Sequence, residues 1–301
     1  MPQMDRIERA LHASLLNPPG GRPPPRLAAA LRHAVFPGGA RIRPQLVLAV
    51  AQACGEDDPA LADAAAAAIE LLHCASLVHD DLPCFDDAST RRGRPSVHRA
   101  YGERLAVLAG DALIICAFDA LGHGATGNPL RLPALLRTVC QGVGMPHGIV
   151  AGQAWECETQ VSLHAYQQAK TGALFAAATM AGAQAAGALP LPWRALGECL
   201  GQAYQVADDI RDAIGDAQTL GKPVRRDILL DRPSMTRELG LDGALSEFRR
   251  LMAQTEASVP PCRGAAGFRA LIRHEAQRLV PTEMASRPSP SVQLGARAAA
   301  A

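Results

Sequence analysis

An aspartate cluster at residues 80–86 sits where negative charge is unfavourable. Asp80 and Asp81 follow an apolar, helix-prone stretch that Pro83 must end, so they fall at a helix C-terminus, with Asp86 just beyond. The helix dipole already places partial negative charge at that end. A nearby cation is therefore expected to compensate the cluster.

A second cluster, Asp208, Asp209 and Asp212, lies inside a segment with a helical pattern. Asp208 and Asp212 are one turn apart on one face, where like charges repel. One such cluster is more often a solvated helix face, but two on apolar helices favour a ligand. Carboxylates without His or Cys partners suit a hard ion such as Mg²⁺, which substrate phosphates complete. The predicted Mg²⁺ ligands are Asp80, Asp81, Asp86, Asp208, Asp209 and Asp212.

Basic residues accompany both clusters. Arg41 and Arg43 lie on a glycine turn, and Arg91 and Arg92 follow the first cluster within a few residues. The planar guanidinium group of arginine binds phosphate oxygens bidentately. Taken singly, each arginine could instead form a salt bridge to a nearby acid. Together with the aspartates, the arginines indicate a diphosphate ligand.

The elements that position these residues are predicted to be helices. Ala, Leu, Arg, Gln and Glu dominate between clusters of Pro and Gly, apolar residues recur at three and four positions, and strand-like alternation is almost absent. No breaker reads as a domain linker. We expect one all-α domain over residues 1–301, without significant sheet and with a disordered tail at 285–301. The expected helices span residues 5–16, 26–35, 44–54, 58–81, 103–122, 131–143, 147–158, 163–187, 193–216, 243–257 and 266–279.

The composition argues against several classes of protein. With 30 Lys and Arg against 29 Asp and Glu, the net charge is +1, which disfavours nucleic acid or an anionic membrane as partner. The eight cysteines stand singly, without zinc-site spacing, and are expected as reduced thiols. No apolar signal core is present at the N-terminus, and polar residues interrupt the most apolar stretch, 61–78. We expect a cytoplasmic protein without stable membrane insertion.

Taken together, these motifs resemble the short-chain trans-isoprenyl diphosphate synthase family along nearly the whole chain. The first cluster is similar to the family's first aspartate-rich motif with the bacterial two-residue insertion, and residues 204–212 are similar to its second motif. Enzymes of carotenoid and bacteriochlorophyll pathways in purple photosynthetic bacteria look most alike. The other matches, in the family's order, are Arg91-Arg92-Gly93, Ala109-Gly110-Asp111-Ala112-Leu113, Gly152-Gln153, Lys170-Thr171-Gly172 and Gly221-Lys222.

The resemblance implies a helical bundle around a central cavity, with the two aspartate clusters facing each other across its mouth. Three Mg²⁺ ions would bridge Asp80, Asp86 and Asp208 to an allylic diphosphate. The diphosphate would ionise, its developing charge stabilised by metal and cations. The double bond of isopentenyl diphosphate would then attack the carbocation, and a proton would be lost. The resemblance also implies a homodimer.

Roles for single residues follow from the resemblance as well. The residues implied to bind the allylic diphosphate are Arg91, Lys170 and Lys222. Those implied to bind isopentenyl diphosphate are Arg41, His73 and Arg92. Alone, His73 would be read as a core histidine, but it lies two helical turns before Asp80. The implied catalytic residues are Asp80, Lys170, Thr171, Gln205 and Asp208, of which Thr171, Gln205 and the Lys170 backbone would direct dipoles toward the carbocation.

Four positions depart from the family pattern. Ala40 replaces a lysine that usually contacts isopentenyl diphosphate. A charged hydrogen bond is worth about 1.5–3 kcal/mol, so binding is weakened unless Arg43 or a neighbour compensates. The similar photosynthetic enzymes share the sequence Gly-Gly-Ala-Arg-Ile-Arg-Pro. The milder departures are Glu156 for Asp, Arg211 for Leu and Arg232 for Lys.

The helix before the first cluster bears on product length. Similar bacterial farnesyl synthases have Tyr five residues before the first motif, where this chain has Ala75 beside Ser76. The tunnel floor would then be lower by one turn, about 5.4 Å, at Leu71 or Leu72, or at Phe118 from another helix. We predict a geranylgeranyl (C20) product for carotenoid or bacteriochlorophyll synthesis. Alternatively, Ala75 only packs within the helix bundle.

Other functions remain open from sequence. A farnesyl diphosphate synthase would differ in product length alone. A class I terpene cyclase shares the first cluster but usually replaces the second with an Asn/Ser/Glu motif. A non-catalytic regulatory subunit typically lacks one cluster, and only Ala40 supports it here. A purely structural bundle leaves the acids at helix ends unexplained.

Overall fold

The computed structural model describes residues 3–16, 21, 23–36, 38–159, 162–214 and 234–280. These residues form an all-α bundle, as predicted, and their only strands are β1 (Thr90–Arg91) and β2 (Arg94–Pro95), which pair antiparallel. The α-helices are α1 (Gln3–Leu16), α2 (Pro25–Val35), α3 (Ile42–Cys54), α4 (Pro59–Asp80), α5 (Val97–Tyr101), α6 (Glu103–Gly124), α7 (Leu132–Val143), α8 (Ile149–Ala154), α9 (Leu163–Gln167), α10 (Ala173–Ala185), α11 (Arg194–Ile214), α14 (Met235–Ala257) and α15 (Ala265–Leu279). The connecting turns are the 3-10 helices η1 (Ala125–Gly127), η2 (Pro129–Arg131), η3 (Trp155–Cys157) and η5 (Leu191–Trp193), and the π-helix η4 (Gln168–Gly172).

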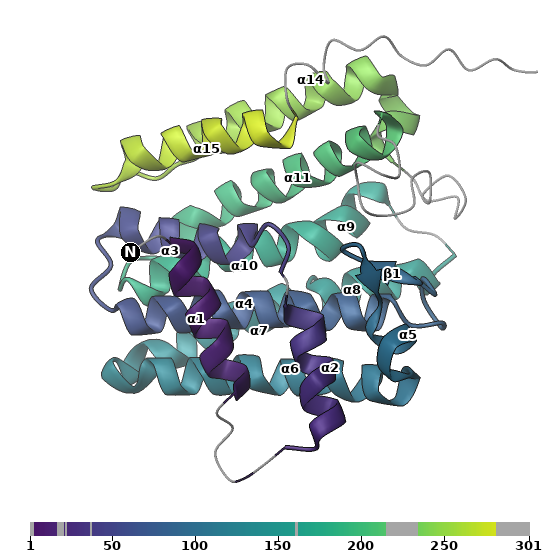
Figure 1. Cartoon of the computed structure of the whole chain (residues 1–301). Coiled ribbons are helices and arrows are strands. Elements are labelled where there is room, and N and C mark those ends of the chain that lie inside the picture. The colour runs from purple at the N-terminus through teal and green to yellow at the C-terminus, as the bar shows by residue number, and fades with distance from the viewer. Residues whose placement is uncertain are drawn as a thin grey trace, which may run out of the picture.

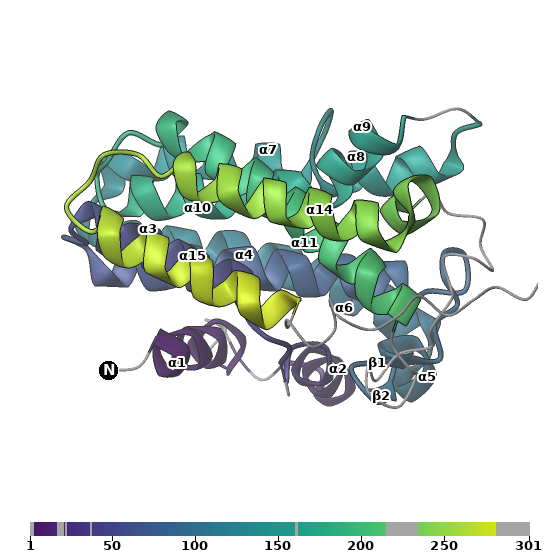
Figure 2. The same cartoon turned by 90° about the horizontal axis from the view of Figure 1, so that it is seen from above.

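The long helices lie roughly side by side, and the short ones gather at one end. Helices α4, α6, α10 and α11 follow one direction in Figure 1, whereas α1 and α2 cross them. Figure 2 shows α1 and α2 together on one side of the bundle, with α14 and α15 across α11. The β-hairpin, α5 and α8 lie at the same end of the bundle (Figure 1).

Helix α4 is the central element because it is apolar on all faces. Its alanine run at residues 64–68 is buried, and Leu71 and Leu72 are 0% and 1% exposed. The helix begins after the cap Asp58, whose carboxylate accepts from the Leu61 backbone N–H at 3.1 Å. It ends at Asp80, three residues before Pro83. This core helix therefore delivers the first aspartate cluster from a rigid support.

A close approach of α11 to η4 fixes the opposite wall. A Cβ added to Gly201 would come within 2.8 Å of the Gly172 Cα, so the two backbones can approach this closely because residue 201 is glycine. The contact brings η4, which carries Thr171, against the part of α11 that carries Gln205.

The structure departs from the predicted helices at four places. The expected helix 163–187 contains the π-helix η4, and the expected helix 147–158 is only α8 followed by a 3-10 turn. Helix α14 begins at Met235 rather than 243, because it continues across a kink at Gly240, whose φ is +71°. The hairpin and the five-residue α5 are too short for a periodic pattern to show. The predicted tail at 285–301, Lys222 and Arg232 lie outside the described residues.

Two helices, α4 and α6, are long and apolar enough to cross a membrane by length and composition alone. In α4, 78% of the apolar window is buried within the protein, as in the core helix of a soluble protein. In α6 only 33% of the window is buried. The test is weak evidence for a membrane span, but it identifies α6 as an apolar helix with an open face.

Candidate active site

The two aspartate clusters open onto one cavity of about 520 Å³. Its walls come from the glycine turn before α3, the end of α4, the hairpin, α8, η4 and α11. Asp80 and Asp208 both line it, although 128 positions separate them in the sequence (208 minus 80). The structure thus brings the two predicted clusters together.

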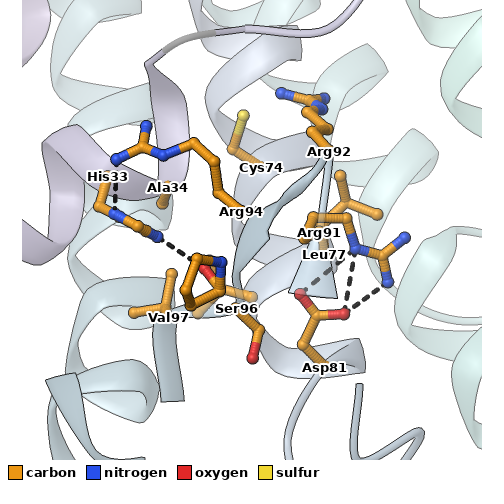
Figure 3. A pocket seen from close by; sticks show the side chains of 12 residues that line it. His33, Ala34, Cys74, Leu77, Asp81, Arg91, Arg92, Arg94, Ser96 and Val97 are labelled. Atoms are coloured by element: carbon orange, nitrogen blue, oxygen red, sulfur yellow. Dashed lines mark hydrogen bonds and ion pairs between the residues drawn. The ribbon is translucent and has the colours of Figure 1, made fainter. Parts of the chain in front are cut away.

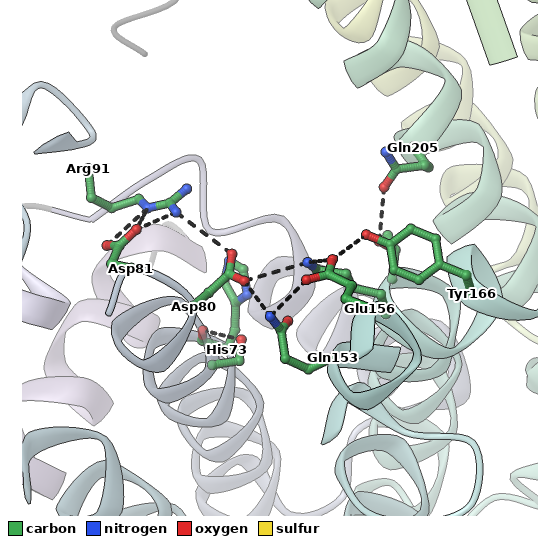
Figure 4. A network of polar contacts seen from close by, with 11 residues as sticks. His73, Asp80, Asp81, Arg91, Gln153, Glu156, Tyr166 and Gln205 are labelled. Atoms are coloured by element: carbon green, nitrogen blue, oxygen red, sulfur yellow. Dashed lines mark hydrogen bonds and ion pairs between the residues drawn. The ribbon is translucent and has the colours of Figure 1, made fainter. Parts of the chain in front are cut away.

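Asp80 stands at the centre of a polar network. Its carboxylate accepts from Gln153 Nε2 at 2.8 Å and lies 3.5 Å from Lys170 Nζ and 3.9 Å from Arg91 Nη2. Figure 4 shows Asp80 between Arg91 on one side and Gln153 and Glu156 on the other. The network ties the end of α4 to α8, η4 and the hairpin.

Three carboxylates in this network could hold a metal ion. Oxygen atoms of Asp80, Asp86 and Glu156 lie within 4.8 Å of one another. An oxygen-only donor set with neighbouring cations for phosphate fits Mg²⁺. Glu156 was noted in the sequence only as a departure from Asp. Its position three residues after Gln153, on the next turn of the chain, is the signal that could have identified it.

Glu156 also holds the side chain of Lys170. One carboxylate oxygen accepts from Tyr166 Oη at 2.6 Å and from Lys170 Nζ at 2.5 Å. Gln153 donates to the other oxygen at 3.1 Å. Lys170 is therefore held between Glu156 and Asp80.

Asp81, one of the predicted metal ligands, is paired with Arg91 in this structure. Its side chain is 3% exposed, and one oxygen accepts from both Nε and Nη2 of Arg91, at 3.0 and 2.5 Å. Successive helical residues point about 100° apart, so Asp81 turns away from the cavity that Asp80 faces. The cation expected to compensate the cluster is Arg91, whose Nε and Nη2 donate to the Asp81 carboxylate.

Asp209, another predicted metal ligand, is also held by a partner within the protein. It is 4% exposed, and its carboxylate accepts from the Met235 backbone N–H at 2.8 Å, which anchors the start of α14. Asp208, in contrast, has a side chain that is 42% exposed and lines the cavity. Its Oδ1 lies 3.1 Å from Arg211 Nη2. Asp212 is half-buried one turn further along α11.

The residues predicted to face a carbocation lie side by side. Thr171 Oγ1 donates to Gln205 Oε1 at 3.0 Å, and Gln205 Nε2 donates to Asp209 Oδ1 at 3.0 Å. Lys170 and Thr171 belong to the π-helix η4, a wider turn that often marks functional sites. Asp209 therefore orients the Gln205 amide so that its oxygen faces Thr171.

Arg41 is also placed differently from the prediction. Its guanidinium is fully buried, donating to Glu8 at 2.9 Å, to Glu70 at 2.7 Å and to the Val35 carbonyl at 2.8 Å. These acceptors leave it little capacity for a diphosphate. The backbone of Arg41 lies in the left-handed region, with a φ of +51°. This conformation directs its side chain back over Gly38.

Arg43 is the arginine of this turn that suits a ligand. Its guanidinium lies 4.4 Å from the centre of the Phe175 ring, lines the cavity, and has a buried Nε without a hydrogen-bond partner among the described residues. Burial lowers the pKa of Arg43, and the charge of Glu70 opposes that effect. A buried unpaired donor is costly, so an anion in the cavity would relieve it.

His73 is neutral in this arrangement. Burial, and then the charges of Arg43 and Arg92, hold its pKa well below the ordinary value of 6.5. Arg43 Nη1 lies 3.4 Å from His73 Nε2, and because arginine can only donate, Nε2 accepts and the proton is on Nδ1. His73 can therefore offer an N–H to a diphosphate without adding charge.

The hairpin that presents Arg91 and Arg92 is anchored from behind. Arg94 donates to the Phe36 carbonyl at 2.8 Å and to His33 Nδ1 at 3.0 Å, and His33 Nε2 reaches the Pro95 carbonyl at 2.7 Å. Figure 3 shows this anchor and the two arginines leaving the hairpin in different directions, Arg91 toward Asp81. The cations of the site are thus held by α2 as well as by α4.

The residues predicted to set product length lie at and behind the cavity wall. Ser76 lines the cavity with Leu77, whereas Ala75 and Leu72 are 2% and 1% exposed within the core. Phe118 of α6 packs partly buried against the same core. Of these four residues, only Ser76 is part of the cavity lining.

Comparison with known sequences gives this arrangement a family. A model of the family described as polyprenyl synthetase matches residues 24–258. The chain is 53% identical over 282 residues to the geranylgeranyl diphosphate synthase of Cereibacter sphaeroides, covering 94% of this chain and 98% of that protein. It is 50% identical over 275 residues to the geranylgeranyl diphosphate synthase of Rhodobacter capsulatus, covering 91% and 95%.

Solved structures are similar over the same extent. A geranyltransferase from Helicobacter pylori, complexed with magnesium and isoprenyl diphosphate, matches with a TM-score of 0.77 and 28% identity, over 92% of this chain and 95% of that one. An FPP/GFPP synthase from Zymomonas mobilis matches with a TM-score of 0.76 and 32% identity, over 90% and 95%.

Proposed function

Because the chain belongs to the polyprenyl synthetase family, we propose that it is a prenyltransferase that condenses isopentenyl diphosphate with an allylic diphosphate to give geranylgeranyl diphosphate. One observation carries the proposal: a single cavity lined by carboxylates from two helices and by arginines from two turns. Carboxylates alone suit many metal sites, but arginines beside them suit a diphosphate. The names of the two bacterial relatives support the twenty-carbon product.

The first step is cleavage of the allylic C–O bond, in which the diphosphate leaves with the electron pair. Asp80, Asp86 and Glu156 on one side, and Asp208 on the other, are the proposed ligands of three Mg²⁺ ions. Bound Mg²⁺ supplies charge that stabilises the departing diphosphate. Lys170, already held beside Asp80, donates to the same oxygens.

The remaining steps use the polar groups along the cavity. The Thr171 hydroxyl and Gln205 amide oxygens face the position of the carbocation and stabilise its charge. Arg43, Arg92 and neutral His73 hold isopentenyl diphosphate so that its double bond attacks that carbon. The new C–C bond leaves a tertiary cation, which loses a proton to the released diphosphate and regains a double bond.

An elongation assay tests this function. Purified protein, Mg²⁺ and radiolabelled isopentenyl diphosphate are incubated with dimethylallyl, geranyl or farnesyl diphosphate in turn, and the products are separated by chain length. We expect a labelled C20 product that disappears with EDTA. A C15 end product would support a farnesyl synthase. No elongation from any starter would favour a non-catalytic regulatory subunit.

Product length is tested separately at Ala75. A tyrosine there would fill the space behind the cavity wall and should shift the product from C20 to C15, because the growing chain loses about one turn of depth. Ala75 is 2% exposed, so overpacking is a risk and folding must be checked by circular dichroism. Ala75→Ser serves as the control of similar size. A folded tyrosine variant with an unchanged product would contradict the floor assignment.

We also propose that the protein is a cytoplasmic homodimer. Eight free thiols suit a reducing compartment. The apolar face of α6 exposes Val107, Leu108 and Ile115 at 42%, 51% and 68%, which a second copy would cover. Light scattering of wild type should give twice the chain mass, and Leu108→Glu with Ile115→Glu should give monomers. A monomeric wild type would contradict the dimer.

A further inference from the structure

A buried carboxylate, Glu70, lies among the arginines of the cavity. It is 2% exposed, belongs to α4 one turn before His73, and lines the same cavity as the two aspartate clusters. A buried charge is costly unless it is paired. Its partners therefore indicate why it is there.

Glu70 Oε1 is the point where several side chains meet. Arg41 Nη1 donates to it at 2.7 Å, Arg92 Nη2 lies 3.9 Å away, and the Cys74 thiol donates at 3.9 Å. Burial, with the charge of Glu70, raises the pKa of Cys74 to about 12, so Cys74 remains a thiol and a donor. One carboxylate thus connects the glycine turn, α4 and the hairpin.

The glycine turn is shaped to let these arginines reach Glu70. A Cβ on Gly38 would meet the Arg41 guanidinium at 2.1 Å, and a Cβ on Gly39 would meet that of Arg92 at 3.0 Å. Arg41 and Arg92 both have a positive φ, 51° and 53°, which is rare for residues other than glycine. Two strained backbones and two bare glycines surround a single acceptor.

The charges explain what Glu70 does. Arg43 and Arg92 carry like charges and repel each other. Burial is the main cause that lowers the pKa of Arg43; the charge of Arg92 lowers it further, and that of Glu70 opposes both effects. Without a fixed counter-charge, these guanidinium groups would move apart and into solvent. Arg41 is bound to Glu70 and has a structural role. The guanidinium groups of Arg43 and Arg92 remain available to bind a ligand in the cavity.

We propose that Glu70 is a positioning residue for the diphosphate of isopentenyl diphosphate, holding Arg92 and Arg43 in place where Ala40 leaves the subsite one cation short. The inference rests on the proposed function, and it concerns binding of the second substrate rather than ionisation of the first. Glu70 does not touch the substrate; it acts through the arginines that do.

The proposal is tested with Glu70→Gln, which keeps shape and removes charge. We expect the KM for isopentenyl diphosphate to rise about tenfold or more, as for loss of a charged hydrogen bond, with the KM for the allylic diphosphate within about twofold. If Glu70 only neutralised the pocket, its loss would strengthen attraction of the diphosphate. A lower or unchanged KM for isopentenyl diphosphate therefore overturns the proposal.

Glu8→Gln is the matched control. Glu8 accepts from the same Arg41, but it lies on α1, outside the cavity lining, with a side chain that is 34% exposed. We expect lower thermal stability and an unchanged KM for isopentenyl diphosphate. Equal increases of this KM in both variants would overturn the specific role of Glu70.

Glu70→Asp covers the case in which the glutamine variant does not fold. It keeps the charge and withdraws the carboxylate by one C–C bond, about 1.5 Å, so an intermediate loss of affinity is expected and wild-type affinity overturns the proposal. Calorimetric titration with isopentenyl diphosphate alone measures that affinity without turnover. Wild type that neither binds nor elongates would refute the proposed function, whereas active wild type with unaffected variants would refute this inference alone.

Discussion

The two aspartate clusters differ in how firmly the protein holds them. Asp80 has a side chain that is 13% exposed and lies within reach of Gln153, Lys170 and Arg91. Asp208 is 42% exposed, and the Arg211 bond beside it comes from its own helix. The first cluster is firmly held because three other elements converge on Asp80. The second presents a carboxylate that is more exposed than that of Asp80, so we expect its position to depend more on the ligands that bind it.

The largest predicted effect contrasts the clusters directly. Asp80→Asn should lower kcat about 10³-fold, because a charge that organises both metal and Lys170 is lost at the preorganised side. Asp208→Asn should lose less and recover partly when Mg²⁺ is raised. Steady-state kinetics over a Mg²⁺ titration measures both. Asp242→Asn on exposed α14 controls for the charge change, and an Asp208 variant worse than the Asp80 variant would invert the comparison.

Within the first cluster, adjacent aspartates should behave differently. Breaking the buried pair of Asp81 and Arg91 by Asp81→Asn should cost about 3 kcal/mol of unfolding free energy, with little change in the Mg²⁺ concentration that gives half activity. Denaturant unfolding and a Mg²⁺ titration separate the two. Asp57→Asn, which breaks an exposed pair with Arg131, should change stability little. If Asp81→Asn instead strongly shifts the Mg²⁺ concentration that gives half activity, Asp81 is a metal ligand.

The sequence predicted the helices well, because alanine-rich periodicity and Pro83 act locally, whereas the convergence of the two clusters was implied by the family resemblance. It did not predict which neighbours face the cavity. Asp81 and Asp209 turn away from the cavity because each accepts a hydrogen bond from another element. The donors are the Arg91 guanidinium and the Met235 backbone N–H. A motif gives the residue types at a site, but the direction of each side chain depends on partners that only the fold supplies.

The same limit explains the exchange of Arg41 for Arg43. Arg41 and Arg43 are two residues apart on one turn, and their residue type alone does not distinguish which of them binds a diphosphate. The left-handed backbone of Arg41 and the buried Glu70, 29 positions away, decide that Arg41 is structural. Glu156 was overlooked as a candidate metal ligand for a related reason, since the packing of α8 against α4 brings it close to Asp80.

A smaller effect concerns how His73, on the helix that carries the first cluster, makes the stability of the protein depend on pH. Well above pH 6.5, His73 is neutral in both the folded and the unfolded state and adds no pH dependence. As pH falls below 6.5, the unfolded chain binds a proton that the folded protein rejects, because the folded pKa is lowered, so stability falls.

The resulting slope should stay below about 1.4 kcal/mol per pH unit. Denaturant unfolding of wild type and His73→Gln between pH 5 and pH 7, at about unit steps, should show the slope in wild type and a flatter curve in the variant. His274→Gln on the exposed side of α15 should keep the wild-type slope. Parallel curves for wild type and His73→Gln would indicate that His73 takes up its proton in the folded protein.

The smallest predicted effect tests whether the second cluster is weakened by its own helix. Arg211 Nη2 lies 3.1 Å from Asp208 Oδ1, and it replaces the leucine usual in the family motif. An ion pair this exposed is worth little, so Arg211→Leu should lower the Mg²⁺ requirement only about twofold. Arg250→Leu on α14 removes the same charge outside the cavity and should leave the requirement unchanged. If Arg211→Leu instead raises it, the guanidinium assists the substrate diphosphate, and the second cluster is better prepared for its ligand than its exposure suggests.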